Sequence, residues 1–451
     1  MPISAVISVS SSASLVPSTL PSVCPTILTP SYNAPVVAPG WTAQLIAQGL
    51  TTPRSLRFDD AGALLVVQQG KGIQRLTFDD YGGTCLVVKT STSVVANTGL
   101  THGIELLSET NTLYASTAND VFAWAYDDST GTVSGSPQNI VTGMTNADHV
   151  SRTLLFSKDP GVGSAQLLVS RGSNANYDAA TSDVSSGRSQ IRHFDVSSNA
   201  ASQFPYNFAS SGSVVGWGLR NSAGLAEEPT THALYSVENS LDDITREGTD
   251  VHANNPGEEL NYHGPLSSVS SPQTRIGGNF GYPTCFALWD TTDFPDLGSL
   301  AVGDQFVTNP TSTLDDSYCA STYYPPRLTF QAHMAPLDIL FEPDGSAAYV
   351  SFHGSWDRPT NIGYKVSQIA FSGGEPVEPS DSTTATQDIF YNADLSVCPG
   401  QCFRPVGLAM DTKGRLFVSS DTTGEIYVLQ KTTTTGGGNP CRLQKKRRRA
   451  A

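Results

Sequence analysis

Short runs of alternating apolar and polar residues recur along the chain, separated by turns rich in Asp and Gly. In the first clear copy, the stretch 53–67 consists of an apolar run, an Asp-Asp-Ala-Gly turn and a second apolar run, and 73–76 follows after another turn. A period of two predicts half-buried strands, and the Asp and Gly residues predict the turns between them. The unit is therefore a β-meander of at least three strands.

Six copies of this unit, the first included, follow one another along the chain. Their onsets are Arg54, His102, Asp148-His149, Arg220-Asn221, Pro336-Leu337 and Arg404-Pro405. One meander cannot bury its own apolar faces, so packing six of them in a circle predicts an all-β fold, a six-bladed β-propeller. A β-sandwich is the alternative, but sandwiches do not repeat one Asp/Gly-turn meander with the same onset. We expect the propeller to span 39–431, after an N-terminal lead (1–38) and before a Thr/Gly-rich, linker-like and basic tail (432–451).

The charge of the chain bears on its partners. Charged residues make up 15% of the 451 residues, and the formal net charge is −15. Six of the 26 basic residues lie in the tail from Cys441 onward, which leaves 20 basic residues against 41 acidic ones in the rest. Binding to nucleic acid requires basic patches that neutralise phosphates, so we expect no nucleic-acid partner.

The seven cysteines give information on the redox compartment in which the protein resides. They lack the CxxC pairs and neighbouring histidines of a zinc site, and they stand at positions 24, 85, 285, 319, 398, 402 and 441. Structural disulfides in an oxidising compartment are the better interpretation. Six can pair within the body, where Cys398 and Cys402 are close enough for a small loop, and Cys441 is left over.

The expected localisation is secreted and extracellular. Residues 1–30 make a poor signal peptide because they lack a basic start and a solid apolar core, so the true leader would be altered or missing. No apolar run approaches the ~20 residues of a membrane helix, and we expect no membrane association.

The onsets of the six units carry unusual chemistry. In a propeller the first strand of each blade lines the central channel, so the onset residues converge on one face. Here they supply three guanidinium groups and two imidazoles, where a purely structural propeller would show small or apolar residues. A ring of like charge requires an anionic occupant. The stretch 353–358 and Lys365 add aromatic planes and further cations, so the pattern predicts a site for a flat polyanion.

Asp148-His149 is the strongest candidate for catalysis. A histidine accepts a proton near neutral pH, and an adjacent carboxylate can orient it or hold a substrate hydroxyl. The alternative is a turn that Asp148 caps, with His149 merely half-buried. Farther along, the segments 238–243, 255–261 and 277–283 form acidic and carbonyl-rich loops, which suit a calcium ion but also suit ordinary turns.

On these residues the chain resembles the quinoprotein sugar dehydrogenases of the soluble glucose and sorbosone dehydrogenase type, most closely the fungal pyranose dehydrogenases that use pyrroloquinoline quinone (PQQ). The resemblance covers roughly 41–431. Its most specific motifs are Asp148-His149, Gly-Leu-Arg-Asn at 218–221, Gly-Glu-Glu-Leu-Asn at 257–261, Asn-Phe-Gly-Tyr-Pro at 279–283, Phe-His-Gly-Ser-Trp-Asp-Arg at 352–358 and Gly-Tyr-Lys at 363–365.

This resemblance implies a secreted oxidoreductase that oxidises a sugar at its anomeric carbon with PQQ and calcium. His149 would be the base that takes the proton from the anomeric hydroxyl, while hydride passes to the quinone; Asp148 would orient substrate and base. Arg220 would face a quinone carboxylate or the reacting carbonyl. The remaining cofactor-binding residues would be Asn221, His353, Trp356, Arg358, Lys365, Arg404 and Arg54. Calcium would bind main-chain carbonyls near Ser240 and Leu241.

The sequence departs from the bacterial glucose enzymes at two of these places. They have Gly-Pro where Ser240-Leu241 stands and a tyrosine where His353 stands, so a preference for glucose is not expected. The loop 171–177 matches them poorly and is expected to form a wall of the substrate site.

Two other functions stay open. Six-bladed propellers also build calcium-dependent lactonases or esterases, and a non-catalytic carbohydrate-binding propeller would need no base. If the chain is a dehydrogenase, its partners are a small sugar and an external electron acceptor: a cytochrome domain, a quinone or a copper enzyme. We expect a monomer.

Overall fold

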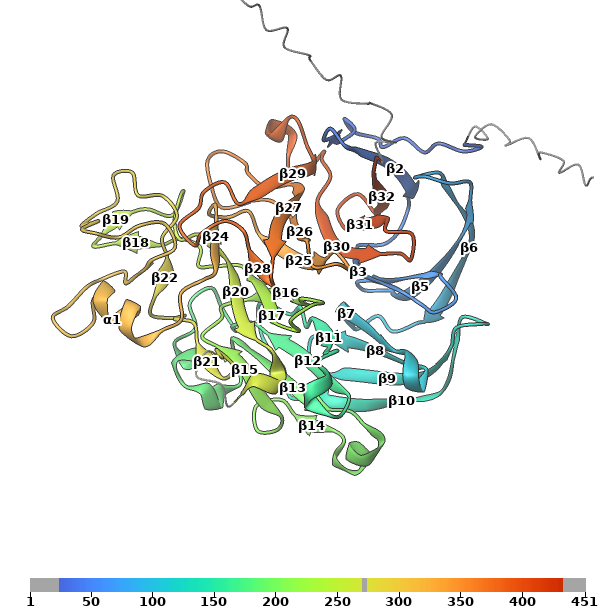
Figure 1. The fold of residues 1–451 in the computed structure, drawn as a ribbon, viewed down its shortest axis with the longest axis horizontal. Coiled ribbons are helices and arrows are strands. Elements are labelled where there is room, and N and C mark those ends of the chain that lie inside the picture. Colours follow the sequence, from blue (N-terminus) through green and yellow to red (C-terminus); the bar gives the residue numbers. More distant parts are fainter. Residues whose placement is uncertain (1–23, 270–273, 433–451) are drawn as a thin grey trace, which may run out of the picture.

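The computed structural model describes residues 24–269 and 274–432, which form short antiparallel sheets arranged around a central axis (Figure 1). The predicted linker and basic tail beyond residue 432, with Cys441, and the first 23 residues of the predicted lead lie outside the described residues. The predicted domain limits therefore stay a prediction.

Six blades carry four main strands each. The first three comprise β3 (Pro53–Phe58), β4 (Leu64–Gln68), β5 (Gly72–Asp80) and β6 (Leu86–Val95); β7 (Leu100–Leu107), β8 (Thr112–Thr117), β9 (Val121–Asp127) and β10 (Thr132–Thr142); β11 (Leu154–Phe156), β12 (Gln166–Arg171), β13 (Gln190–Asp195) and β15 (Ser213–Trp217). The last three comprise β16 (Ser222–Glu227), β17 (Leu234–Glu238), β20 (Glu258–Gly264) and β24 (Leu328–Phe330); β25 (Pro336–Phe341), β26 (Ala347–Phe352), β27 (Lys365–Ser372) and β29 (Thr386–Tyr391); β30 (Pro405–Met410), β31 (Leu416–Ser420), β32 (Glu425–Lys431) and β2 (Trp41–Ala47).

Short elements extend some blades. The strands among them are β1 (Val36–Val37), which pairs with β29, β14 (Tyr206–Asn207), which pairs with β10, and β21 (Gly278–Asn279), which pairs with β15; β28 (Glu375–Pro376) pairs with β27. Two long connections lie within blade four. The one between β17 and β20 holds β18 (Thr245–Arg246) and β19 (Thr249–Asp250), and the one between β20 and β24 holds β22 (Phe286–Ala287), β23 (Gln305–Phe306) and helix α1 (Asp316–Thr322).

The innermost strands of the blades form a closed ring. Around the axis β3 contacts β7, and contacts continue through β11, β16, β25 and β30 back to β3. Strand β2, from near the N-terminus, completes blade six by pairing with β32, so that Trp41 lies opposite Lys431. The N-terminal and C-terminal parts of the propeller are thus joined by hydrogen bonds within one blade. The predicted six-bladed propeller is confirmed.

A buried serine in the second strand links several blades to the next. Ser116 accepts a hydrogen bond from the Gly103 amide (2.9 Å) and donates one to the Arg152 carbonyl (2.7 Å) in blade three. Ser419 in blade six similarly donates to the Arg54 carbonyl of blade one (2.7 Å). Because a Cβ at Gly103 would overlap the Arg152 carbonyl oxygen, the inner strands approach more closely than side chains allow.

Three disulfides stabilise the described part of the chain. They join Cys24 to Cys85, Cys285 to Cys319 and Cys398 to Cys402. The predicted small loop between Cys398 and Cys402 is confirmed. Among residues 24–269 and 274–432, no helix has the length and apolar character needed to span a membrane.

Candidate active site

A pocket of about 260 Å³ lies where the onsets of blades three, four and five meet. Six of the residues that line it are predicted site residues: Asp148, His149, Arg220, Asn221, Ser240 and Trp356. The other lining residues were not predicted as site residues: Asn239, Asp242, Glu258, His333 and Ala335. Loops far apart in the chain therefore converge on one cavity, as the propeller prediction requires.

His149 has the geometry of a general base. Its Nδ1 lies 3.1 Å from the Ser173 carbonyl oxygen and 2.9 Å from Ser173 Oγ. A carbonyl can only accept, so Nδ1 carries the proton and Nε2 keeps a lone pair. Burial, helped by the positive charge of Arg220, lowers the pKa of His149 to about 4. The ring is therefore neutral at neutral pH, and Nε2 can accept a proton.

The backbone at His149 is strained. Its φ of 38° lies in the left-handed region, which a non-glycine residue seldom adopts. The Asp148 carboxylate accepts the His149 amide at 2.8 Å, which stabilises this turn. Asp148 itself is exposed and lines the pocket, so its predicted role in orienting substrate and base stays a prediction. Strain of this kind collects at functional sites, where the surrounding structure holds it in place.

Arg220 is buried, and most of its guanidinium N–H groups donate to protein groups. Its guanidinium donates to Asp242 Oδ2 (2.8 Å), to the Asn176 side chain (2.8 Å) and carbonyl (3.1 Å), and to the Asn239 carbonyl (3.2 Å). Its own amide donates to the buried Glu238 (2.6 Å). The positive charge of Arg220 is thus already paired with Asp242. Asn176 belongs to the loop 171–177, the predicted wall, which also holds His149 through Ser173.

A second cluster joins Arg54, His353 and Arg404 around Asp421, which the sequence reasoning missed. Asp421 accepts from Arg54 at 2.7 Å and from His353 Nε2 at 2.9 Å, while Arg404 donates to His353 Nδ1 at 3.0 Å. Because a guanidinium cannot accept, Nδ1 of His353 is the acceptor and its Nε2 carries the proton. Burial lowers the pKa of His353. Burial alone would raise the pKa of Asp421, but His353 and Arg54 hold it well below its usual range.

The partners of Arg404 differ from those of Arg220. Within the part of the chain that the structure describes, its guanidinium contacts His353 Nδ1, the carbonyls of His353 (3.2 Å) and Gly354 (3.3 Å), and the face of the Tyr364 ring (5.5 Å to the centroid), and it forms no ion pair with a carboxylate. The Nε of Arg54 is also buried without a hydrogen-bond acceptor among those residues. Guanidinium groups in such places are stabilised by an anion.

The remaining predicted cofactor-binding residues lie at the rim or behind the site. Trp356 is 70% exposed and lines the pocket mouth. Arg358 donates to Asn254 (3.1 Å), which lies between β19 and β20 of blade four. Lys365 pairs with Asp388 at 2.9 Å on the blade itself. For Arg358 and Lys365 a role in cofactor binding stays a prediction.

The predicted metal ligands Ser240 and Leu241 follow the end of β17. The Ser240 amide donates to Glu258 at 2.7 Å, and the Leu241 side chain is buried in an apolar cluster. Neither carbonyl accepts a hydrogen bond from residues 24–269 or 274–432, so both oxygens are free to bind a cation. Just beyond them, Asp242, His333 and Asp357 place one ligand atom each within 4.8 Å of one another. Sequence spacing could not reveal this group, because its members come from three separate loops.

Comparison with known proteins agrees with this geometry. A family model described as TrAA12-like matches residues 35–432. The chain belongs to this family. The PQQ-dependent sugar dehydrogenase of Hypocrea jecorina (strain QM6a) is 50% identical over 413 residues, which are 91% of this chain and 92% of that protein. The resemblance inferred from the motifs is therefore confirmed.

Solved structures give the same result. A calcium structure of the Trichoderma reesei carbohydrate-active enzyme of family AA12 matches with a TM-score of 0.86 at 51% identity, covering 90% of this chain and 100% of that one. The PQQ domain of the Coprinopsis cinerea pyranose dehydrogenase, in its holo form, matches with a TM-score of 0.81 at 34% identity, covering 90% and 99%. The chain spans 56% of the length of the curated pyranose dehydrogenase from that organism, to which it is 35% identical over 425 residues.

Proposed function

We propose that this family member oxidises a sugar at its anomeric carbon with PQQ and calcium, and passes the electrons to an external acceptor. The observation that carries the proposal is Arg404, a half-buried guanidinium without a carboxylate partner among the described residues, next to the buried Arg54, whose Nε has no acceptor there. Three carboxylates of a flat quinone supply the oxygens that this face lacks. The residues present therefore fit PQQ.

Arg404 and Arg54 would hold the quinone on the side of blades six and one, and Asn221 and Arg220 on the side of blade four. When bound, the quinone supplies the hydride acceptor for the anomeric carbon. Since Arg220 is already neutralised by Asp242, it contributes directed N–H groups more than net charge. The side chains of Arg358 and Lys365 are engaged elsewhere and would have to turn to take part.

The protein's own groups then handle the substrate proton. Nε2 of His149 accepts it from the anomeric hydroxyl, while Ser173 keeps the opposite ring nitrogen protonated. The resulting imidazolium is stabilised by the exposed Asp148 beside it. Trp356 offers an apolar face against which a sugar ring can pack at the mouth.

Calcium would bind the free carbonyls of Ser240 and Leu241, with the Asp242 carboxylate adjacent. Calcium prefers six to eight oxygen ligands, so an imidazole such as His333 is a poor partner and the ion's remaining ligands must come from the quinone and water. At this position the calcium ion would act as a Lewis acid. Calcium and quinone should consequently bind with positive coupling. Calorimetry of calcium binding with and without PQQ tests this, and equal affinities would place the ion elsewhere.

A calcium-dependent lactonase is the second candidate, favoured by the acidic and amide groups of the pocket, including Asp242, Glu258 and Asn239. Two of these are already engaged, however, because Asp242 pairs with Arg220 and Glu258 accepts the amides of Ser240 and Ala335 (2.7 and 3.1 Å). A hydrolase metal would have to displace those contacts.

One experiment separates these functions. Metal-free protein is mixed with calcium and PQQ, and the cofactor spectrum and the bleaching of a dye acceptor are followed after a panel of sugars is added. We expect a perturbed spectrum and sugar-dependent bleaching. A normal spectrum, together with calcium-dependent hydrolysis of a lactone, would reject the dehydrogenase.

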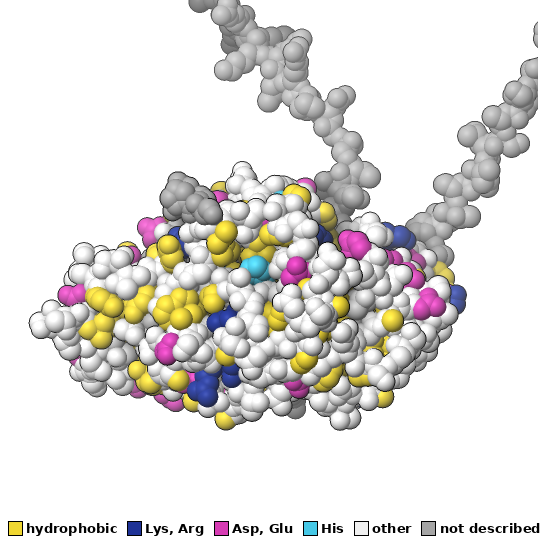
Figure 2. Space-filling view, turned by 90° about the horizontal axis from the view of Figure 1, so that it is seen from below, with side chains coloured by type: hydrophobic (Ala, Val, Ile, Leu, Met, Phe, Trp, Pro, Cys, Tyr) yellow, Lys and Arg dark blue, Asp and Glu magenta, His cyan; other side chains and the backbone are white. Residues whose placement is uncertain are grey.

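We further propose that the protein acts outside the cell as a monomer. Three disulfides among the described residues fit an oxidising compartment. On the face shown in Figure 2, acidic and basic side chains are interspersed without a continuous basic patch, which fits a sugar substrate better than nucleic acid. A cytochrome domain, a quinone or a copper enzyme would accept the electrons. Fractionation of a culture and light scattering of the pure protein test the localisation and the monomer.

A further inference from the structure

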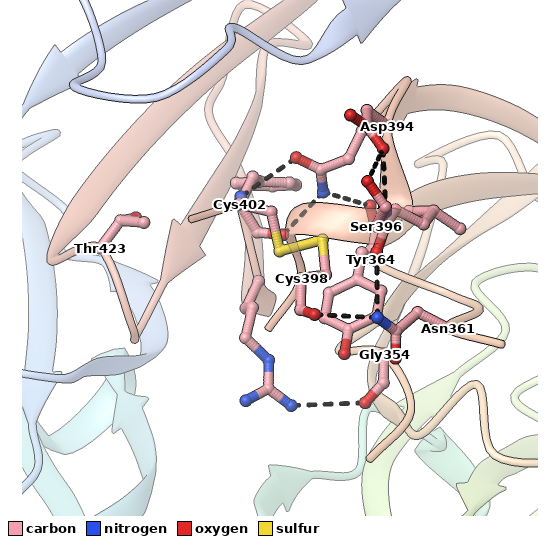
Figure 3. The surroundings of a disulfide bond; sticks show 12 residues. Gly354, Asn361, Tyr364, Asp394, Ser396, Cys398, Cys402 and Thr423 are labelled. Carbon is pink, nitrogen blue, oxygen red and sulfur yellow. Dashed lines mark hydrogen bonds between the residues drawn. A yellow bond between two sulfur atoms is a disulfide. The ribbon is translucent and has the colours of Figure 1, made fainter. Parts of the chain in front are cut away.

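The Cys398–Cys402 disulfide lies directly behind the face that Arg404 presents. It closes residues 398–402 between β29 and β30, and the segment 395–402 that contains it is here called the cystine loop. Cys398 and Cys402 are both buried, and they pack with the fully buried Tyr364 in one small apolar cluster (Figure 3). A covalent bond therefore supports the ring on which the Arg404 guanidinium lies.

The same disulfide also supports the rim loop, residues 354–363, which carries Trp356. Asn361 of this loop donates to the carbonyls of Cys398 (2.8 Å) and Leu395 (3.0 Å) (Figure 3). The Tyr364 hydroxyl donates to the Ser355 carbonyl. The rim loop is thus fastened at one end to the cystine loop and at the other to the ring that the disulfide contacts.

Arg404 follows the cystine loop after a single residue. Its guanidinium lies over the Tyr364 ring and reaches the Gly354 carbonyl at 3.3 Å. A Cβ at Gly354 would overlap that ring, so loop and ring are in direct contact. The disulfide therefore touches all three supports of Arg404: its preceding chain, the aromatic ring below it and, through Asn361, the rim loop.

Loop length argues that this disulfide does more than stabilise the fold. A cross-link removes entropy from the unfolded chain in proportion to the logarithm of the loop it closes. Cys398 and Cys402 are separated by 4 positions, whereas Cys24 and Cys85 are separated by 61. The Cys398–Cys402 disulfide is therefore expected to stabilise the whole fold less than the Cys24–Cys85 disulfide does, although it is the one beside the site.

We propose that the Cys398–Cys402 disulfide is a positioning element: it fixes Arg404 and the rim loop for anion binding, and its loss loosens that face while the propeller stays folded. The proposal rests on the proposed function, in which Arg404 holds a quinone carboxylate. Reduction of the bond, with two electrons and two protons from a thiol reductant, would give the same loosened state as substitution.

The test compares Cys398→Ser/Cys402→Ser with Cys24→Ser/Cys85→Ser. PQQ affinity is measured by calorimetry with calcium present, and hydrogen exchange is followed in peptides covering 354–364. We expect the first variant to bind PQQ at least about tenfold more weakly, as loss of outer support typically does, and to exchange faster in the rim loop. The control should lose more thermal stability and keep both its affinity and its rim-loop exchange.

Asn361→Ala gives a second measurement without touching sulfur. It removes the link between the cystine loop and the rim loop, and we expect faster rim-loop exchange and weaker PQQ binding. Unchanged affinity and exchange in both variants would overturn the proposal, as would global unfolding of Cys398→Ser/Cys402→Ser at a temperature where the control stays folded. If the wild type binds no PQQ, the proposed function fails, while the exchange data still decide whether the disulfide positions the rim loop.

Discussion

Two histidines at the same end of the channel have opposite hydrogen-bonding arrangements. His149 donates from Nδ1 to Ser173, and its Nε2 has no hydrogen-bond partner among the residues that the structure describes. His353 instead accepts at Nδ1 from Arg404 and donates from Nε2 to Asp421. Burial lowers the pKa of both rings, so both are neutral at neutral pH. The free lone pair belongs to His149 alone of the two.

This difference shows that the hydrogen-bonding partners of the ring decide which histidine can act as a base. Residue type and burial do not decide it. A carbonyl forces protonation on the nitrogen that it faces, and a guanidinium forces the opposite. His353 is consequently a rigid neutral link between Asp421 and Arg404, suited to shaping a binding surface. His149 is suited to proton transfer.

The largest expected effect follows from removing the base. His149→Ala should reduce kcat by about 10²–10⁴-fold and leave PQQ affinity nearly unchanged, because a positioned general base contributes this much. His353→Ala, the matched control, should weaken PQQ binding and lower kcat far less. Steady-state kinetics with PQQ titration measures both, and His149→Ala activity above about a tenth of the wild type would reject the assignment.

The next largest effect is expected on PQQ affinity, where substitutions of Arg404 and Arg220 should differ. Arg404→Ala should weaken PQQ binding by about ten- to a hundredfold, since a hydrogen bond to a charged group contributes about 1.5–3 kcal/mol. Arg220 is already paired with Asp242, so Arg220→Ala should weaken affinity less and also lower the rate. Equal losses of affinity, measured by calorimetry at fixed calcium, would contradict the difference in their counter-ions.

The pH dependence should follow His149. Because its pKa is lowered to about 4 in the folded protein, kcat/KM should fall only below about pH 4. Between pH 6.5 and 4 the unfolded chain binds a proton that folded His149 refuses, so acidification through this window should lower the free energy of unfolding. Urea unfolding at several pH values checks the sign. His149→Gln should show a shallower decline, and an unchanged slope would assign the effect elsewhere.

Asp421→Asn should have the smallest effect. The amide retains one acceptor but removes the charge that fixes Arg54 and His353, so we expect a few-fold weaker PQQ binding and a mixed tautomer at His353. Nitrogen NMR of labelled histidine reports the tautomer. If His353 keeps a single tautomer in the variant, Arg404 alone fixes it.

The sequence by itself determined the propeller, because six meanders with one period and one turn chemistry cannot bury their faces in any other simple arrangement. It also predicted that Asp148-His149 and Arg220-Asn221 meet, since strand onsets of a propeller share one face. The pocket contains all four.

Only the tertiary structure decided how these groups are paired. Asp421 stands in a turn of Asp, Thr and Gly that looks ordinary in sequence, yet it joins Arg54, 367 positions away, to His353. Asp242 neutralises Arg220, whereas Arg404 forms no ion pair with a carboxylate of residues 24–269 or 274–432, although both arginines begin a blade in the same way. Charge pairing and tautomers depend on distances of about 3 Å between loops of different blades, and a one-dimensional pattern holds no such distances.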